Sequence, residues 1–221
     1  VAFMTPHPGQ DFDWLGKNVD GAVALADVVG GTPAVSEDPP RYLDILFSAA
    51  VKAGKPVDLH LDEHLKADVH LLDAALERVE RFGMQGRTVF SHVSVLSALP
   101  RSEFQRIAER LLALDVGVVT LPAANLYLQG RDAEMLPPRG LTRVAELYRA
   151  GVTIATASDN IQDPFVPTGS GDMPEIARWT LLAGHLRGDE LGAAHRMITT
   201  APARLMGLGK DYGFKTGARA D

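Results

Sequence analysis

The chain has 221 residues, of which 46% are hydrophobic and 23% are charged. This composition is typical of a globular protein with a full core, not of a disordered segment. The net charge is −6, and because no concentrated basic block occurs, nucleic-acid binding is not expected. No apolar run reaches the ~18 residues of a membrane helix. The lack of cysteine excludes disulfides, thiolate ligands and a cysteine nucleophile, and a cytoplasmic location is expected.

Six short apolar runs, rich in β-branched residues, predict buried strands that alternate with helices. Their starts lie roughly 25 to 37 residues apart, which is the size of one strand-and-helix unit. Strands that are apolar on both faces and separated by helices indicate a parallel sheet in an α/β protein. The six predicted strands are Val1–Thr5, Ala26–Gly30, Val57–Leu61, Thr88–His92, Val116–Pro122 and Thr153–Ser158.

Two of the intervening helices have a clear apolar face at helical spacing. They are predicted at Asp68–Phe82 and Glu103–Leu114, and Ser102 with Gln105 forms a capping-box pattern at the start of the second. The predicted apolar faces comprise Val69, Leu72, Leu76 and Val79 in the first helix, and Phe104, Ile107, Ala108, Leu111 and Leu112 in the second.

Two closures of such a sheet compete: an open doubly wound sheet and a (β/α)8 barrel. The open sheet requires a glycine-rich phosphate loop after an early strand, and its nearest candidate, Gly169-Ser170-Gly171, is late and incomplete. The barrel requires polar, ionisable residues at the carboxyl ends of several strands, which is the pattern found. We therefore predict a (β/α)8 TIM barrel, represented by about six strand-and-helix units.

The third predicted strand ends in imidazoles and carboxylates, in the order His60, Asp62, Glu63 and His64. Neutral imidazole and carboxylate are the usual ligands of a divalent metal where thiols are absent. Glu63 follows His60 by three residues, too far along to share its side of the strand. On the following loop Glu63 can reach inward as a proton carrier, although a solvated polar loop explains the same residues equally well.

Two further strands end in ionisable residues: His92 closes the fourth strand, and Asp159 with Asn160 follows the last. Each alone has an ordinary structural explanation, as a packed histidine or a turn-forming aspartate. Together, however, the strand ends place ionisable groups at one mouth of the sheet, and this conjunction favours a functional site. Gln129 lies in a loop at the same end and can contact a substrate.

Five segments resemble cytosine deaminases of the amidohydrolase superfamily, and they keep the order and spacing of that family through essentially the whole chain. The stretch from Ser158 to Met173 is also similar to N-isopropylammelide isopropylamidohydrolase, a relative that acts on s-triazines. The five segments are His60-Leu61-Asp62-Glu63, Ser91-His92, Asn125–Arg131, Arg139–Val144 and Ser158-Asp159-Asn160.

The resemblance implies a distorted (β/α)8 barrel with one catalytic divalent metal, zinc or iron. By this resemblance His60 and Asp159 match metal ligands, and Asp159 also takes part in catalysis. Glu63 matches the glutamate that moves a proton between water and a ring nitrogen of the substrate, and His92 matches the histidine that orients the attacking water. The predicted substrate-binding residues are Thr5, Gln129, Asn160 and Phe165.

This sequence departs from the family pattern at three places. The His-x-His pair of the first barrel strand does not occur in it, which leaves the predicted metal site half supplied. Thr5 stands about where cytosine deaminases carry a substrate-reading glutamine, and Asn160 replaces a second aspartate, so the substrate stays open. We expect the six units to be the third to the eighth of the barrel, in a single domain over residues 1–221 that is incomplete at its N-terminus.

The predicted reaction is the removal of an amino or alkylamino group from a nitrogen heterocycle by attack of water. One alternative is a cyclic-amide hydrolase of the dihydroorotase or hydantoinase type, which usually bridges two metals with a carboxylated lysine. Val28–Thr32, at the equivalent strand end, contains no lysine. Another alternative is a catalytically incomplete barrel fragment. The expected partners are a small heterocyclic substrate and further copies of the chain in a homo-oligomer, with neither nucleic acid nor membrane.

Overall fold

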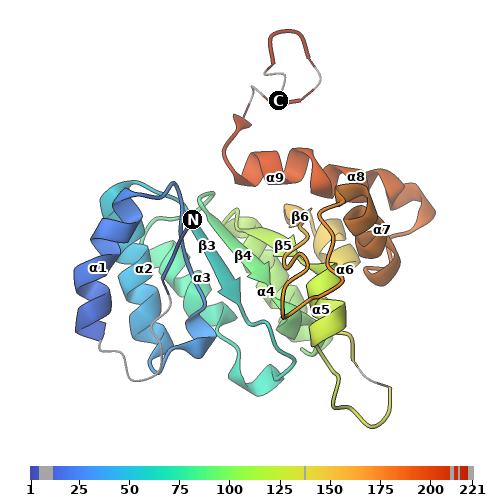
Figure 1. Cartoon of the computed structure of the whole chain (residues 1–221), viewed down its shortest axis with the longest axis horizontal. Helices are drawn as coiled ribbons and strands as arrows, with labels where there is room; N and C mark the ends of the chain where they lie inside the picture. Colours follow the sequence, from blue (N-terminus) through green and yellow to red (C-terminus); the bar gives the residue numbers. More distant parts are fainter. Residues whose placement is uncertain (5–11, 137, 210–211, 214, 219–221) are drawn as a thin grey trace.

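The computed structural model describes residues 1–4, 12–136, 138–209, 212–213 and 215–218. In this part of the chain six parallel strands form one sheet, in the order β1-β2-β3-β4-β5-β6 (Figure 1). Each strand pairs with its neighbours in the sequence, and right-handed connections place the linking helices on one face of the sheet. The strands are β1 (Ala2–Phe3), β2 (Val29–Gly31), β3 (Val57–Leu61), β4 (Thr88–His92), β5 (Gly117–Thr120) and β6 (Ile154–Thr156).

The sequential strand order distinguishes between the two closures of the sheet. An open doubly wound sheet reverses its strand order at one point, so that helices cover both of its faces. Among the described strands the order does not reverse. The sheet is therefore of the barrel type, in which the face opposite the helices forms the barrel interior.

The helices surround the sheet along its length. In chain order they are α1 (Phe12–Ala24), η1 (Pro33–Val35), α2 (Pro39–Ala53), η2 (Ala67–Val69), α3 (Leu72–Arg81), η3 (Ser94–Ser97), α4 (Arg101–Ala113), α5 (Pro122–Leu128), α6 (Val144–Arg149), α7 (Met173–Ala183), η4 (Gly188–Glu190), α8 (Leu191–Ile198) and α9 (Thr200–Leu205). Figure 1 shows α1 and α2 at one flank of the strands, with α5, α6 and α7 at the opposite flank. Within the described ranges, no helix is long and apolar enough to cross a membrane.

Buried apolar side chains from the sheet and from the helices form one continuous core. Leu59 of β3 and Phe90 of β4 are fully buried, and Leu46 and Phe47 of α2 and Ile107 of α4 belong to the same cluster. Burial of a side chain of this size contributes about 1.5–3 kcal/mol relative to exposure. This core fixes the strands whose carboxyl ends carry the ionisable residues.

The predicted strands are confirmed, with β3 and β4 at the predicted bounds and the other four displaced or shortened by a few residues. The first predicted helix starts later than expected, at Leu72. The carboxylate of Asp62 accepts the backbone N–H of Leu71 at 3.0 and 2.9 Å, and this contact ends the preceding loop. Val69 consequently lies outside the helix and is 54% exposed, so its predicted burial was wrong.

The second predicted helix starts earlier than expected, at Arg101, directly after Pro100. Pro100 is the N-cap residue, with φ −54° and ψ 150°, so the helical backbone begins at the next residue. Ser102 therefore lies inside the helix and the capping box predicted there was wrong. Leu112, predicted on the apolar face, is half-exposed.

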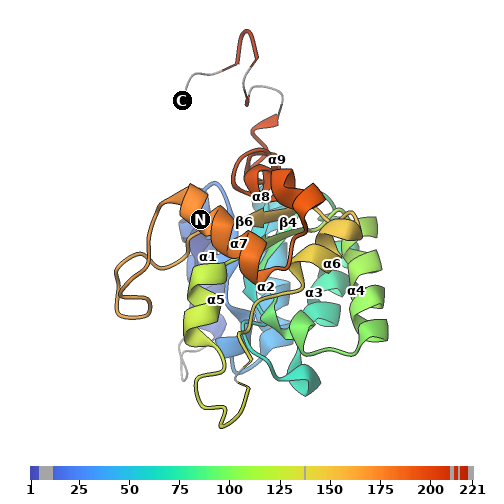
Figure 2. The same ribbon diagram turned by 90° about the vertical axis from the view of Figure 1, so that its right-hand side faces the viewer.

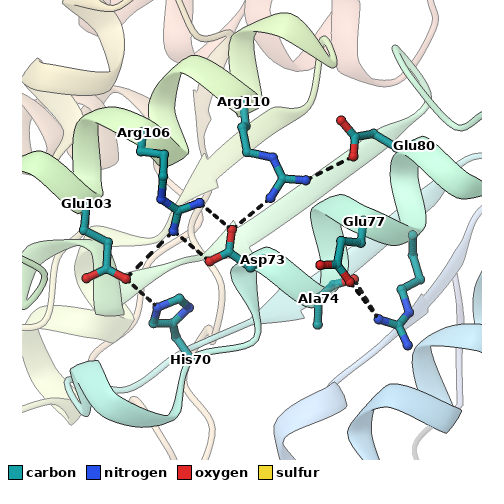
Figure 3. A network of polar contacts seen from close by, with 9 residues as sticks. His70, Asp73, Ala74, Glu77, Glu80, Glu103, Arg106 and Arg110 are labelled. Carbon is teal, nitrogen blue, oxygen red and sulfur yellow. Dashed lines mark hydrogen bonds and ion pairs between the residues drawn. The ribbon is translucent and has the colours of Figure 1, made fainter.

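An ion-pair network joins α3 to α4 on the outer surface (Figure 3). Asp73, in the first turn of α3, accepts hydrogen bonds from both terminal nitrogens of Arg106 at 2.7 Å each and from Arg110 at 2.9 Å. Glu103 of α4 lies 3.2 Å from the ring of His70, which stands two residues before the start of α3. The network ties the segment that follows β3 to the next helix along the barrel.

Candidate metal-dependent active site

The alternation of β3 decides which of its side chains face the barrel interior. Val57, Leu59 and Leu61 are buried, whereas Asp58 and His60 are partly exposed on the opposite face of the strand. Successive side chains of a strand point to opposite faces, so the apolar set packs under the helices and the polar set faces inward. The sequence Val-Asp-Leu-His-Leu thus places an imidazole at the inner end of a buried strand.

The backbone turns sharply at each of the three strand ends that carry ionisable residues. Asp62, His92 and Asp159 have positive φ angles of 51°, 67° and 61°, a region that residues other than glycine rarely adopt. Backbone strain of this kind concentrates at active sites, where the surrounding structure holds it in place. His92 and Asp159 are themselves candidate site residues of the sequence pattern, and Asp62 directly precedes a third, Glu63.

Three side chains from different strand ends meet at the mouth of the sheet. One ligand atom each of Glu63, His92 and Asp159 lies within 4.8 Å of the others. His92 Nδ1 is 3.3 Å from Glu63 Oε1, and its other ring nitrogen, Nε2, is 3.2 Å from His60 Nδ1. The ring of Phe3 packs edge-on against His60, with centroids 4.8 Å apart. The four ionisable residues therefore form one cluster.

A fifth residue of this cluster, Asn125, was missed by the sequence reasoning. It lies in α5, its side chain is fully buried, and its Nδ2 is 3.3 Å from Glu63 Oε1 and 3.1 Å from His92 Nδ1. Gln129, four residues further on, donates from Nε2 to the backbone carbonyl of Glu63 at 2.9 Å. Gln129 follows the last residue of α5 and has an extended backbone, so helical spacing does not link the two amides; the signal available for Asn125 was its place in the segment Asn125–Arg131 that resembles the family.

Burial and neighbouring charges shift the protonation of the cluster. Burial raises the pKa of Glu63 to about 7, and the negative charge of Asp159 adds to the rise. Burial lowers the pKa of His92 to about 3, with a further contribution from His60 and an opposing one from the hydrogen bond of Asn125. The pKa of Asp159 is raised by burial, against the attraction of His60. Near neutral pH, Glu63 can thus exchange a proton, while His92 is uncharged.

Two further aspartates of the β3 segment support the cluster. Asp58 lies below His60 on the same face of the strand and accepts a hydrogen bond from Ser91 Oγ at 3.0 Å, and burial raises its pKa. Asp62 is fully buried and binds the backbone at Leu71, so it closes the loop that carries Glu63. Burial raises the pKa of Asp62 to about 6.

The predicted substrate-binding residues are placed in different ways. Thr5 lies outside the described residues. Gln129 holds the backbone of Glu63. Asn160 follows Asp159 directly and donates from Nδ2 to Asp163 Oδ2 at 2.6 Å, while the Phe165 ring is 64% exposed in the same loop. Figure 2 shows this loop, drawn in orange between β6 and α7, beside α5. Their substrate-binding roles stay predictions.

The donor set of the cluster fits a divalent metal ion. Donor atoms that share one zinc ion, each about 2.0–2.2 Å from it, lie no more than about 4.4 Å apart. The observed 4.8 Å span of the Glu63, His92 and Asp159 donors slightly exceeds this limit, so these three atoms would have to move closer together to share one ion. Imidazole nitrogen and carboxylate oxygen suit zinc and iron alike. The assignment of His60 and Asp159 as the ligands stays a prediction, and the ring of His60 already lies against His92.

The parallel barrel-type sheet and the imidazole and carboxylate cluster at its carboxyl edge define an α/β protein with the features of a metal-dependent enzyme. The model of the amidohydrolase family matches residues 11–221, and the chain belongs to this family. The predicted family is thereby confirmed.

Three relatives agree with this assignment. The pterin deaminase of Rhizobium rhizogenes is 34% identical over 181 residues, which cover 81% of this chain and 41% of the relative. The structure of 5-methylcytosine deaminase from Klebsiella pneumoniae liganded with 5-fluorocytosine has a TM-score of 0.88, with 30% identity, over 93% of this chain and 51% of that one. N-isopropylammelide isopropylaminohydrolase from Burkholderia multivorans has a TM-score of 0.79, with 33% identity, over 93% and 50%.

The structural likeness confirms the predicted barrel-type α/β fold. The chain spans about half the length of the relatives that it matches. The numbering of its six strands as the third to the eighth of a barrel stays a prediction.

Proposed function

We propose that this chain carries the catalytic cluster of a metal-dependent hydrolase that removes an amino or alkylamino group from a nitrogen heterocycle. The observation that carries the proposal is the convergence of Glu63, His92 and Asp159 at the carboxyl ends of parallel strands. The names of the relatives support it, since they denote a pterin deaminase, a 5-methylcytosine deaminase and an N-isopropylammelide isopropylaminohydrolase. We further propose that residues 1–221 belong to one domain, because their core is continuous.

The residues of the cluster divide the work of hydrolysis among them. His60 and Asp159 would hold the metal. When bound, a divalent metal lowers the pKa of water to about 7 and so supplies a nucleophile at neutral pH. Water attack on the carbon that bears the amino group requires one proton to leave the water and one to reach a ring nitrogen.

Glu63 is suited to carry that proton. Its pKa of about 7 lets it accept a proton from the attacking water and deliver it to the ring nitrogen at the same pH. A second proton must reach the departing nitrogen, so that the carbon–nitrogen bond breaks with release of ammonia or an amine. Asp159 lies within the same 4.8 Å span as Glu63, so the two carboxylates are close enough for a proton to pass between them.

His92 has a different part in the reaction. A histidine with a pKa of about 3 stays neutral at neutral pH and donates no charge to the transition state. A neutral ring can still offer one N–H to the attacking water and so fix the direction of attack. His92 therefore orients the water, and Glu63 moves the proton.

The substitution Glu63→Gln tests the proposal. In the intact, metal-loaded protein we expect ammonia release to fall by about 10²–10⁴-fold, because the amide cannot carry the proton. Metal content should be unchanged. Glu109→Gln, on the exposed face of α4, is the matched control and should keep full activity. The substrates to test are a pterin, cytosine, 5-methylcytosine and an alkylamino-s-triazine. Normal turnover by the Glu63→Gln protein would overturn the assignment of the proton carrier.

A further inference from the structure

The loop between β6 and α7 folds back on itself directly after Asp159, over residues 160–169. Asp163 accepts three N–H groups of this loop: Nδ2 of Asn160 at 2.6 Å, and the backbone N–H groups of Phe165 at 3.0 Å and Val166 at 2.9 Å. Its Oδ2 receives the bond from the side chain, and its Oδ1 receives both bonds from the backbone. One carboxylate thus ties Asn160 to the turn that follows it.

Gly169 closes the far end of the loop. Its N–H donates to the carbonyl of Val166 at 3.0 Å, and a β-carbon at this position would lie 2.1 Å from the carbonyl oxygen of Asn160. No side chain can be accommodated at that distance, so glycine is required for the two ends of the loop to meet. Gly171 is not restricted in this way, because a β-carbon there would meet the side chain of Ile161 at an ordinary 3.4 Å.

The contact with Asp163 decides the direction of the Asn160 side-chain amide. Hydrogen bonds from the backbone of Val166 and from Asn160 lower the pKa of Asp163, so its carboxylate is ionised at neutral pH and can only accept. A flipped amide would place Oδ1 of Asn160 at the same 2.6 Å from Oδ2, with no hydrogen between two acceptors. Among the described residues nothing donates to Oδ1 of Asn160, so this oxygen is left as an acceptor.

We propose that Asp163 and Gly169 are positioning residues that present Oδ1 of Asn160 as a hydrogen-bond acceptor for an N–H group of the substrate. The inference rests on the proposed function, because Asn160 directly follows Asp159 and is one of the predicted substrate-binding residues. It adds a requirement to that function: the substrate offers a donor, either an amino group or a ring N–H, to this side chain.

Asp163→Asn tests the direction of the amide. Residue 163 keeps one oxygen for the two backbone N–H groups, so its new NH2 group faces Asn160, whose amide must then turn round and present its own NH2. Nitrogen-15 NMR of the intact zinc-loaded protein measures this change. The side-chain signal of Asn160, assigned as the one lost in Asn160→Ser, should move because its hydrogen no longer bonds to a carboxylate. Asp27→Asn, at an exposed position before β2, should leave the signal unchanged.

The same variant should raise KM. Two donors would face each other between Asn160 and the substrate, and we expect KM to rise by about 10–100-fold for whichever of the four test substrates the wild-type protein uses best. Because the lost interaction is one of binding, kcat should change far less. A merely structural role of Asp163 would instead lower kcat together with the stability of the protein.

Gly169→Ala provides a second variant that alters no polar group. The added β-carbon must push away the carbonyl of Asn160 and so open the loop. We expect the Asn160 signal to move and KM to rise, whereas Gly171→Ala, the matched control in the same segment, should behave as the wild type. An unmoved Asn160 signal in a folded Asp163→Asn or Gly169→Ala protein would overturn the proposal. A moved signal with an unchanged KM would overturn it as well.

The NMR measurement separates this inference from the proposed function, because the direction of the amide is seen without turnover. If Glu63→Gln left ammonia release unchanged while Asp163→Asn moved the Asn160 signal, the proposed function would fail and the positioning role would stand. If Glu63→Gln abolished release and the Asn160 signal did not move, the positioning role alone would fail.

Discussion

The mouth of the sheet and the outer face of α3 and α4 use the same residue types in opposite ways. On the outer face carboxylates meet guanidinium groups at the surface, as Asp73 meets Arg106, and this hydrogen bond lowers the pKa of Asp73. At the mouth, Glu63 and Asp159 lie close together and burial raises the pKa of both. A carboxylate paired with a guanidinium at the surface keeps its charge. A carboxylate buried beside another carboxylate has a pKa closer to neutrality and can exchange a proton.

The backbone shows the same contrast. The strand ends at the mouth carry positive φ angles at Asp62, His92 and Asp159. The outer network is built on two regular helices, whose apolar faces belong to the core. Strain at the mouth must be balanced by stable packing elsewhere, and the helices supply it. Substitutions at the mouth should therefore change activity most, and substitutions in the outer network should change stability only slightly.

The largest effect is expected from Asp159→Asn at the mouth. The substitution keeps the shape of the side chain but removes a negative charge from the proposed metal site. We expect the metal content of the purified protein to fall and ammonia release to drop by about 10²–10⁴-fold. Elemental analysis and an ammonia assay measure the two effects. Asp189→Asn, on the exposed surface, is the control. Full metal content and full activity would show that Asp159 is not a ligand.

An intermediate effect is expected from Asp62→Ala, which acts on the loop between the two regions. The variant leaves the N–H of Leu71 without its carboxylate partner inside the protein, and it frees the start of α3. We expect the free energy of unfolding to fall by about 1–3 kcal/mol. Urea unfolding measures it, with Asp68→Ala on the exposed side of η2 as the control. Equal stability of the two variants would show that this contact does not hold the loop.

The sequence predicted the frame of the mouth more reliably than its details. The alternation Val57-Asp58-Leu59-His60-Leu61 sets both the bounds of β3 and the inward direction of His60, because a strand has a period of two. Parallel strands finish at one edge, so the meeting of Glu63 with Asp159 follows from topology. Neither inference needs a long-range contact to be known in advance.

The details depend on contacts between distant residues, which periodicity does not show. Asn125 lies in a short helix and reaches Glu63 across 62 positions of the chain. Its buried amide is indistinguishable in the sequence from a solvated one. Likewise, Val69 fits a helical pattern, but the carboxylate of Asp62 binds Leu71 and delays the start of the helix. At both places a contact between residues far apart in the sequence decides the structure, and the local sequence pattern does not predict it.

A small effect is expected from Asp73→Asn in the outer network. The change weakens the paired hydrogen bonds from Arg106 and the contact with Arg110, all of which are partly exposed to solvent. We expect a loss of about 0.5–1 kcal/mol at low salt, as for other exposed ion pairs. The loss should shrink at about 1 M salt because screening weakens the pairs in the wild type. A loss that does not depend on salt would show that packing, not charge, joins α3 to α4.

The smallest effect is the acid dependence of the same network. The hydrogen bond from Arg106 lowers the pKa of Asp73 in the folded protein, so its contribution is fully present above the pKa of the unfolded chain, about 4. The contribution is lost as the pH falls through the lower, folded value. Urea unfolding over the acid range should therefore show a smaller drop in stability for Asp73→Asn than for the wild type. Glu190 provides a second case, because the hydrogen bond from Arg149 lowers its pKa to about 2. If both Asp73→Asn and Glu190→Gln followed the wild-type acid profile, the exposed carboxylates would not be the groups that lose their partners in acid.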